Sequence, residues 1–183
     1  IPQSGPVLLA ANHPNSLIDP VLLGIVARRP MRLMAKSTLF DIPLFGKVLH
    51  SLGMVPAYRG TDDRSQVARN HESLALAAKQ LAAGHAMGIF PEGKSHDAHQ
   101  LSLVRSGAAR LAFQALAAGA QGLKVVPVGL HYEEKARFRS AVWIKVGEPV
   151  DAAEWLAQNQ GDEHLAMRTL TAELNARLKS VVL

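Results

Sequence analysis

VLLAANHPNSLID, residues 7–19, joins an apolar run to a cluster of polar side chains, and this junction decides the fold. The run at residues 7–11 has the length and composition of a buried strand. In open α/β sheets, ligands bind beyond the carboxyl ends of the strands. His13 and Asp19 therefore stand where a base and its orienting carboxylate are expected. The sequence predicts an enzyme.

A second apolar run, residues 86–91, leads into a loop that gathers Glu92, Lys94, His96, Asp97 and His99. Proline and glycine occur in ordinary turns as well, so it is the charged cluster that favours a functional loop. His96, Asp97 and His99 are residue types that could bind a metal ion. However, no second group of ligands stands at a suitable spacing elsewhere, and we expect no metal.

Composition narrows the class of protein and of partner. The 183 residues are 48% apolar and 19% charged, which is typical of a globular chain. The absence of cysteine excludes disulfides, thiolate metal sites and cysteine nucleophiles. A net charge of +5 suits an anionic partner, such as a phosphorylated substrate or an acidic membrane face. Nucleic acid is not expected, because aromatic residues are few and long runs of Lys and Arg are absent.

The length predicts a single domain over residues 1–183. No apolar segment reaches the roughly 20 residues of a transmembrane helix, and no signal peptide is recognisable. Because the chain starts at Ile1, close to its first strand, we expect a domain excised from a longer chain, which could carry an anchor elsewhere.

Strand-like and helix-like segments alternate along the chain. The predicted strands are Val7–Ala11, Met31–Ala35, Met54–Ala57, Ala86–Phe90, Val125–Leu130 and Val142–Val146. The predicted helices are residues 19–27, Pro43–Leu52, 64–83, Ser106–Ala118, Ala152–Gln158 and Glu163–Lys179. This alternation predicts an α/β fold with a largely parallel or mixed central sheet, covered by helices on both faces.

Both members of the His/Asp pair also have structural explanations. A loop histidine such as His13 commonly bonds to backbone at a strand end. Asp19 directly precedes Pro20, which makes it a good helix N-cap, a contact that stabilises a helix by about 1 kcal/mol. The roles are compatible, since one carboxylate oxygen can cap the helix while the other accepts the imidazole N–H.

Basic residues follow several of the predicted strands. Arg59 is well placed to bind a phosphate with two parallel N–H bonds. Lys36, Lys94 and Arg105 also fall at or soon after strand ends, and Arg105 precedes a helix N-terminus, which favours anions. The glycine motifs of dinucleotide and nucleoside-triphosphate sites and the serine elbow of hydrolases are absent, so those chemistries are not expected.

Four blocks, in this order, resemble the glycerolipid acyltransferase family, which includes glycerol-3-phosphate and lysophosphatidate acyltransferases. Asn12-His13 through Asp19 resembles the family's His/Asp block. GMVPAYR, residues 53–59, resembles the second block, which ends in a phosphate-binding arginine. FPEG, residues 90–93, resembles the third, whose glutamate contacts the acceptor, and VVPV, residues 125–128, the fourth, associated with the acyl donor.

The chain departs from the family's pattern in two blocks. Five residues separate His13 from Asp19, where the family has four. The third block usually continues Thr-Arg-Ser, and here Lys94-Ser95-His96 follows. Lys94 then replaces the usual cation, and Arg105 stands where the family often has lysine.

The resemblance implies an O-acyltransferase that moves a fatty acyl group from acyl-CoA or acyl-carrier protein to a glycerol-phosphate-type acceptor. His13 is then the base and Asp19 its orienting carboxylate. No permanently bound cofactor is expected. The residues expected to bind substrate are Asn12, Lys36, Arg59, Glu92, Gly93, Lys94 and Arg105.

Two other functions stay open. One is a transacylase that takes its acyl chain from a phospholipid, and the other is an inactive lipid-binding module, favoured by the irregular His13–Asp19 spacing. Because such substrates reside in bilayers and positive charge favours anionic lipid, we expect a peripheral or anchored protein at the cytoplasmic face of a membrane. Pro43–His50 could present an apolar patch to that membrane or belong to the core.

Overall fold

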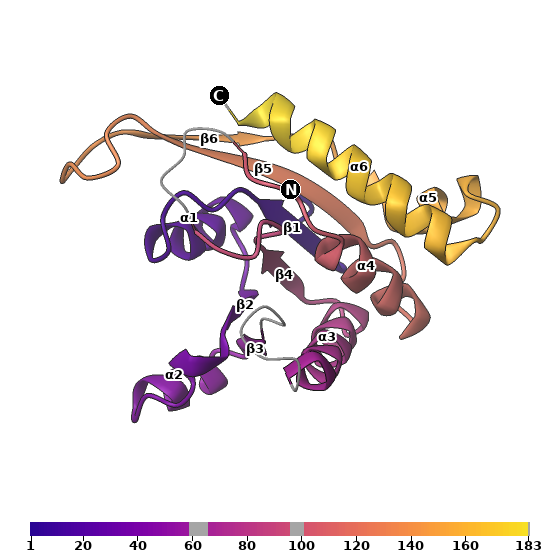
Figure 1. The fold of residues 1–183 in the computed structure, drawn as a ribbon, viewed down its shortest axis with the longest axis horizontal. Coiled ribbons are helices and arrows are strands. Elements are labelled where there is room, and N and C mark those ends of the chain that lie inside the picture. Colours follow the sequence, from indigo (N-terminus) through magenta and orange to yellow (C-terminus); the bar gives the residue numbers. More distant parts are fainter. Residues whose placement is uncertain (59–65, 96–100, 183) are drawn as a thin grey trace.

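The computed structural model describes residues 1–58, 66–95 and 101–182, which form one mixed sheet with helices packed against it (Figure 1). The hydrogen-bonded strand order is β3-β2-β4-β1-β5-β6, and β7 also pairs with β5. The strands from β3 to β5 in this order are parallel, whereas β6 and β7 run antiparallel to β5. The bounds are β1 Val7–Ala11, β2 Met31–Lys36, β3 Val55–Ala57, β4 Ala86–Ile89, β5 Lys124–Tyr132, β6 Val142–Val146 and β7 Val150–Asp151.

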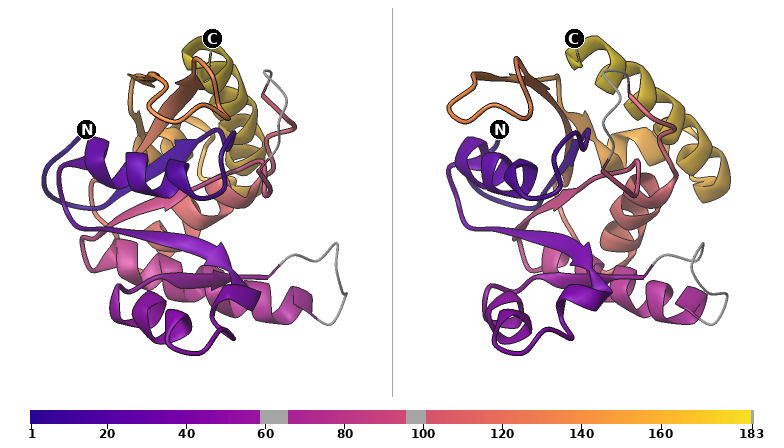
Figure 2. Two further views of the ribbon diagram at one scale, coloured as in Figure 1. Left: turned by 90° about the vertical axis from the view of Figure 1, so that its left-hand side faces the viewer. Right: turned by 60° about the vertical axis from the view of Figure 1, so that its left-hand side comes forward.

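The helices cover both faces of the sheet, unequally. α3 to α6 lie on one face and α1 lies on the other (Figure 2). The predicted α/β fold is therefore confirmed. No helix among the described residues is long and apolar enough to cross a membrane. The bounds are α1 Ile18–Ala27, α2 Phe45–Ser51, α3 Gln66–Ala82, α4 Gly107–Ala117, α5 Ala152–Gln158 and α6 Glu163–Val181, with a 3-10 turn at Ser37–Leu39.

β1 is the central strand, and all five of its residues are buried. Because side chains alternate along a strand, Leu8 and Ala10 join the core beneath α3, α4 and α6. Leu9 packs on the other face, in the cluster that holds Leu23 of α1. With both faces covered, β1 reads as a continuous apolar run, and the loop at its carboxyl end starts from a rigid support.

Most boundaries differ from the prediction by one or two residues, and two of these differences have a clear physical reason. The helix predicted at Pro43–Leu52 begins only at Phe45, because a tight turn precedes it in which the Phe45 N–H bonds to the Pro43 carbonyl at 2.8 Å. β5 continues past the predicted end at Leu130 to Tyr132, because β6 pairs with it that far. The two-residue strand β7 and the 3-10 turn are too short to show a period and were not predicted.

Gly129 of β5 packs against the end of α6, where an added Cβ would lie 2.1 Å from the Val181 carbonyl oxygen. Gly129→Ala should therefore lower the free energy of unfolding by roughly 3 kcal/mol. Gly24→Ala is the control, because a Cβ in that part of α1 meets nothing within 4 Å. That substitution should raise the free energy of unfolding by about 0.5 to 1 kcal/mol. Urea unfolding measures both, and equal changes would contradict this packing.

Candidate active site

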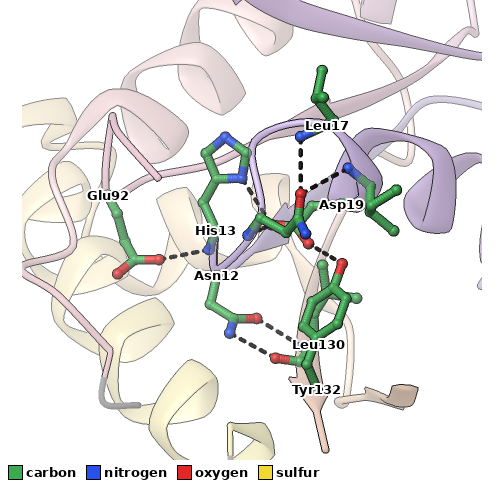
Figure 3. A network of polar contacts seen from close by, with 9 residues as sticks. Asn12, His13, Leu17, Asp19, Glu92, Leu130 and Tyr132 are labelled. Atoms are coloured by element: carbon green, nitrogen blue, oxygen red, sulfur yellow. Dashed lines mark hydrogen bonds and ion pairs between the residues drawn. The ribbon is translucent and has the colours of Figure 1, made fainter. Parts of the chain in front are cut away.

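His13 and Asp19 meet directly beyond the carboxyl end of β1 (Figure 3). His13 Nδ1 lies 2.9 Å from Asp19 Oδ2, and the Asp19 side chain is fully buried. Because a carboxylate only accepts hydrogen bonds, Nδ1 carries the proton and Nε2 keeps a free lone pair. The His13 ring also stacks on Phe90, with ring centroids 3.9 Å apart. The imidazole is therefore held in one tautomer and one orientation.

The five intervening residues are accommodated by a compact turn. The Asp19 N–H bonds to the Asn15 carbonyl at 3.2 Å, and the Asn15 N–H bonds to Asp19 Oδ2 at 2.7 Å. The turn brings the carboxylate back to His13 in spite of the extra residue. The longer spacing thus leaves the hydrogen bond between His13 and Asp19 intact.

The prediction that Asp19 caps the helix is wrong. α1 begins one residue earlier, at Ile18, and Asp19 lies within its first turn. Both Asp19 oxygens are used elsewhere, on His13, Asn15 and Tyr132. The Asn15 side chain instead accepts the N–H groups of Leu17 and Ile18, each at 3.2 Å. Asn15 therefore supports the start of the helix and leaves Asp19 to the site.

Glu92 is buried on the other side of the His13 backbone (Figure 3). Its Oε1 accepts the His13 N–H at 2.8 Å, and its Oε2 accepts the Ser102 N–H at 2.6 Å. These bonds tie the loop after β1 to the segment between β4 and α4. Substrate contact by Glu92 stays a prediction, whereas the hydrogen bonds show that Glu92 fixes the main chain of His13.

Asn12 is buried and bonds to the backbone of β5. Its Nδ2 donates to the Leu130 carbonyl at 2.9 Å, and its Oδ1 accepts the Leu130 N–H at 2.7 Å. The side-chain amide thus continues the β1–β5 pairing beyond the last pair of strand residues, Ala11 and Val128. Asn12 holds the site to β5, and its predicted contact with substrate is untested.

The remaining predicted residues lie in the loop after β4 and at the end of β2, or outside the described residues. Gly93 adopts φ +78°, and Arg105 packs beside it, with its N–H bonded to the Pro91 carbonyl at 2.9 Å. Lys94 is exposed in the same loop. Lys36 is exposed at the end of β2, which β4 separates from β1. Arg59 lies outside the described residues.

The predicted absence of a metal can be compared only with the described residues. Among them, no three His, Asp or Glu side chains converge as a metal site would require. His96, Asp97 and His99, the metal candidates of the sequence, lie outside the described residues.

The sequence model of the family described as Acyltransferase matches residues 1–131. The chain belongs to the acyltransferase family. It is 39% identical over 82 residues to glycerol-3-phosphate O-acyltransferase 2 of Saccharomyces cerevisiae, covering 44% of this chain and 11% of the yeast protein. It is 25% identical over 131 residues to a 1-acyl-sn-glycerol-3-phosphate acyltransferase of Borreliella burgdorferi, covering 72% of this chain and 48% of that protein.

A solved structure shares the fold of this chain. PlsC of Thermotoga maritima, a 1-acyl-sn-glycerophosphate acyltransferase, superposes with a TM-score of 0.62 at 21% identity, covering 96% of this chain and 68% of the PlsC chain. The chain spans less than half the length of the yeast and Borreliella relatives.

Tyr132 is a residue of the site that sequence reasoning missed. Its hydroxyl donates to Asp19 Oδ1 at 2.5 Å, across 113 positions of sequence. Burial raises the pKa of Tyr132, and the hydrogen bond and charge of Asp19 raise that pKa further, so the hydroxyl stays a neutral donor at physiological pH. A signal was present: Tyr132 continues the alternation of Val128 and Leu130, which face the same cluster as α1.

Tyr132→Phe should lower the free energy of unfolding by about 2 kcal/mol at neutral pH, because a buried carboxylate loses a donor. Since the folded state raises the pKa of Tyr132 above its usual 10.0, that difference should be complete below pH 10 and shrink above it. Urea unfolding of both proteins across this range provides the measurement. Tyr58→Phe is the control, and a Tyr132→Phe protein as stable as the parent would contradict the contact.

Proposed function

We propose that this acyltransferase moves a fatty acyl group from acyl-CoA or acyl-carrier protein to a hydroxyl of glycerol-3-phosphate or lysophosphatidate. The observation that carries the proposal is the 2.9 Å contact between His13 Nδ1 and the buried Asp19 carboxylate. The names of the relatives, which specify glycerol-3-phosphate or its 1-acyl form as acceptor, support the substrate class.

His13 is the general base of the proposed reaction. Its Nε2 removes the proton of the acceptor hydroxyl as the hydroxyl oxygen attacks the thioester carbonyl carbon. The C–S bond then breaks, and the imidazolium returns its proton to the departing thiolate. Asp19 stabilises the imidazolium and fixes its tautomer. The acceptor supplies the nucleophile, which suits a chain that contains no cysteine.

Cations bind the acceptor phosphate in this proposal. Arg59, which follows β3 in the sequence, is the principal one, and it acts with Lys94 and Arg105 beside the Gly93 turn and Lys36 at the end of β2. A phosphate held by these groups places the acceptor hydroxyl against His13, which converts an encounter into a near-unimolecular step. Glu92 and Asn12 act chiefly by holding His13 in position.

We also propose where the enzyme works and what it lacks. It functions at the cytoplasmic face of a membrane, as one domain over residues 1–183, and it needs no permanently bound cofactor. The intact His13–Asp19 bond removes the observation that favoured an inactive lipid-binding module.

His13→Ala should lower the kcat of acyl transfer by about 10²- to 10⁴-fold while the unfolding transition is kept, because a general base is lost. The assay measures thiol release from acyl-CoA or acyl-carrier protein, with glycerol-3-phosphate, dihydroxyacetone phosphate or lysophosphatidate as acceptor. His164→Ala, an exposed histidine of α6, is the matched control. Near-parental turnover in His13→Ala would exclude this mechanism. Acyl transfer from phospholipid without any thioester would establish the transacylase instead.

Arg59→Ala should raise the KM for the phosphorylated acceptor by about 10- to 100-fold, because a charge-assisted hydrogen bond to phosphate is lost. The KM for the acyl donor should stay close to that of the parent. Steady-state kinetics with each substrate varied in turn separate the two constants. Arg168→Ala, at an exposed position of α6, is the control. A rise in the donor KM alone would show that Arg59 does not bind the acceptor.

A further inference from the structure

The outer surface of α1 carries only apolar side chains. Its single charged residue, Asp19, is buried in the site, while Leu23 and Ala27 pack on the sheet. The residues that α1 exposes to solvent are Ile18, Val21 and Ile25. A surface helix of a soluble domain normally has a polar outer face, and a helix that is apolar all round is normally covered. Something other than water is therefore expected against α1.

The turn before α2 exposes a second apolar group. Leu44 adopts φ +68° and ψ −50°, and the hydrogen bond from Phe45 to Pro43 closes a γ-turn around it. This γ-turn is rare and strained for a residue with a side chain. The strained backbone directs Leu44 outward, where it is 76% exposed, beside exposed Phe45 and Val48. The segment Pro43–His50 thus presents an apolar patch, and of its apolar residues only Leu49 is buried.

The tip of the β5–β6 hairpin, residues 133–141, exposes one large apolar side chain among charged residues. Phe138 is 88% exposed, the highest value among the exposed large hydrophobic residues. The Arg139 guanidinium lies over its ring, 5.5 Å from the centroid, while Arg137 is ion-paired with Glu134 at 2.9 Å. An aromatic ring beside an arginine suits the boundary between lipid headgroups and acyl chains.

These protrusions lie on one side of the molecule. α1, α2 and the hairpin tip are all on the left-hand side of Figure 1, and this side faces the viewer in the left panel of Figure 2. His13 is close to this side, because α1 begins at Ile18 and Asp19 in its first turn contacts His13. We call this surface the docking rim, and define it by the exposed apolar residues of these three segments, which are Ile18, Val21, Ile25, Leu44, Phe45, Val48 and Phe138.

We propose that the docking rim seats the enzyme on an anionic lipid bilayer, with its apolar side chains in the interface and Lys47 and Arg139 against lipid phosphates. The net charge of +5 complements such a surface. The inference rests on the proposed function, because a bilayer at the rim would deliver a lipid acceptor directly beside His13.

Vesicle flotation tests the docking rim. The chain should float with vesicles of phosphatidylcholine and phosphatidylglycerol, and less with phosphatidylcholine alone or at high salt. Leu44→Ser and Phe138→Ser should each reduce the bound fraction by about tenfold, because each removes a large apolar group from the interface. Leu165→Ser on α6 is the matched control, since Leu165 is 42% exposed and lies outside the rim. Equal losses in rim and control variants would overturn the proposal.

Two further measurements distinguish membrane docking from self-association of the chain and from the proposed function. If rim variants alter self-association in light scattering without vesicles, and leave vesicle binding unchanged, the rim joins copies of the chain and the proposal is overturned. His13→Ala should float like the parent, because the His13 side chain is not part of the rim. Flotation that depends on the rim, in a protein with no acyl transfer, would retain the docking surface and reject the proposed function.

Discussion

The site depends on one buried charge. The Asp19 carboxylate is removed from solvent and is stabilised by three donors, His13 Nδ1, the Asn15 N–H and the Tyr132 hydroxyl. A buried carboxylate without such partners would be strongly unfavourable. The donors come from the loop after β1 and from the end of β5, so all three reach Asp19 only when β1 and β5 are paired in this register. The orientation of His13 therefore depends on the pairing of these two strands.

Glu92 is a second buried carboxylate, and it holds the opposite side of His13. Its contact is to the main chain, whereas Asp19 holds the ring. In the proposed reaction, an anionic acceptor that approaches His13 also approaches the oxygen atoms of two buried carboxyl groups, which repel a phosphate. Arg105 and Lys94, close to Glu92 in the sequence, are the cations proposed to offset this repulsion.

The sequence predicts those parts of this structure that depend on local pattern. The alternation of apolar runs and helical periods gives the α/β class, and polar residues directly after β1 and β4 give the location of the site. It does not predict contacts made across the sheet. The Asp19–Tyr132 bond depends on strand order, and the loss of the expected helix cap follows because Asp19 is taken up by that network. The γ-turn at Leu44 is invisible too, since Pro43 alone suggests a helix start.

α1 satisfies three constraints at once, and this explains its unusual composition. Its inner side must be apolar to pack on the sheet, its first turn must deliver Asp19 to His13, and its outer side is apolar where a surface helix normally carries charge. Packing requires only the inner side, and the proposed base requires only the first turn. The proposed docking to lipid accounts for the outer side, because it places the helix that holds Asp19 at the bilayer surface. A bilayer there would also lower the local dielectric around His13 and Asp19, which strengthens the bond on which the proposed base depends.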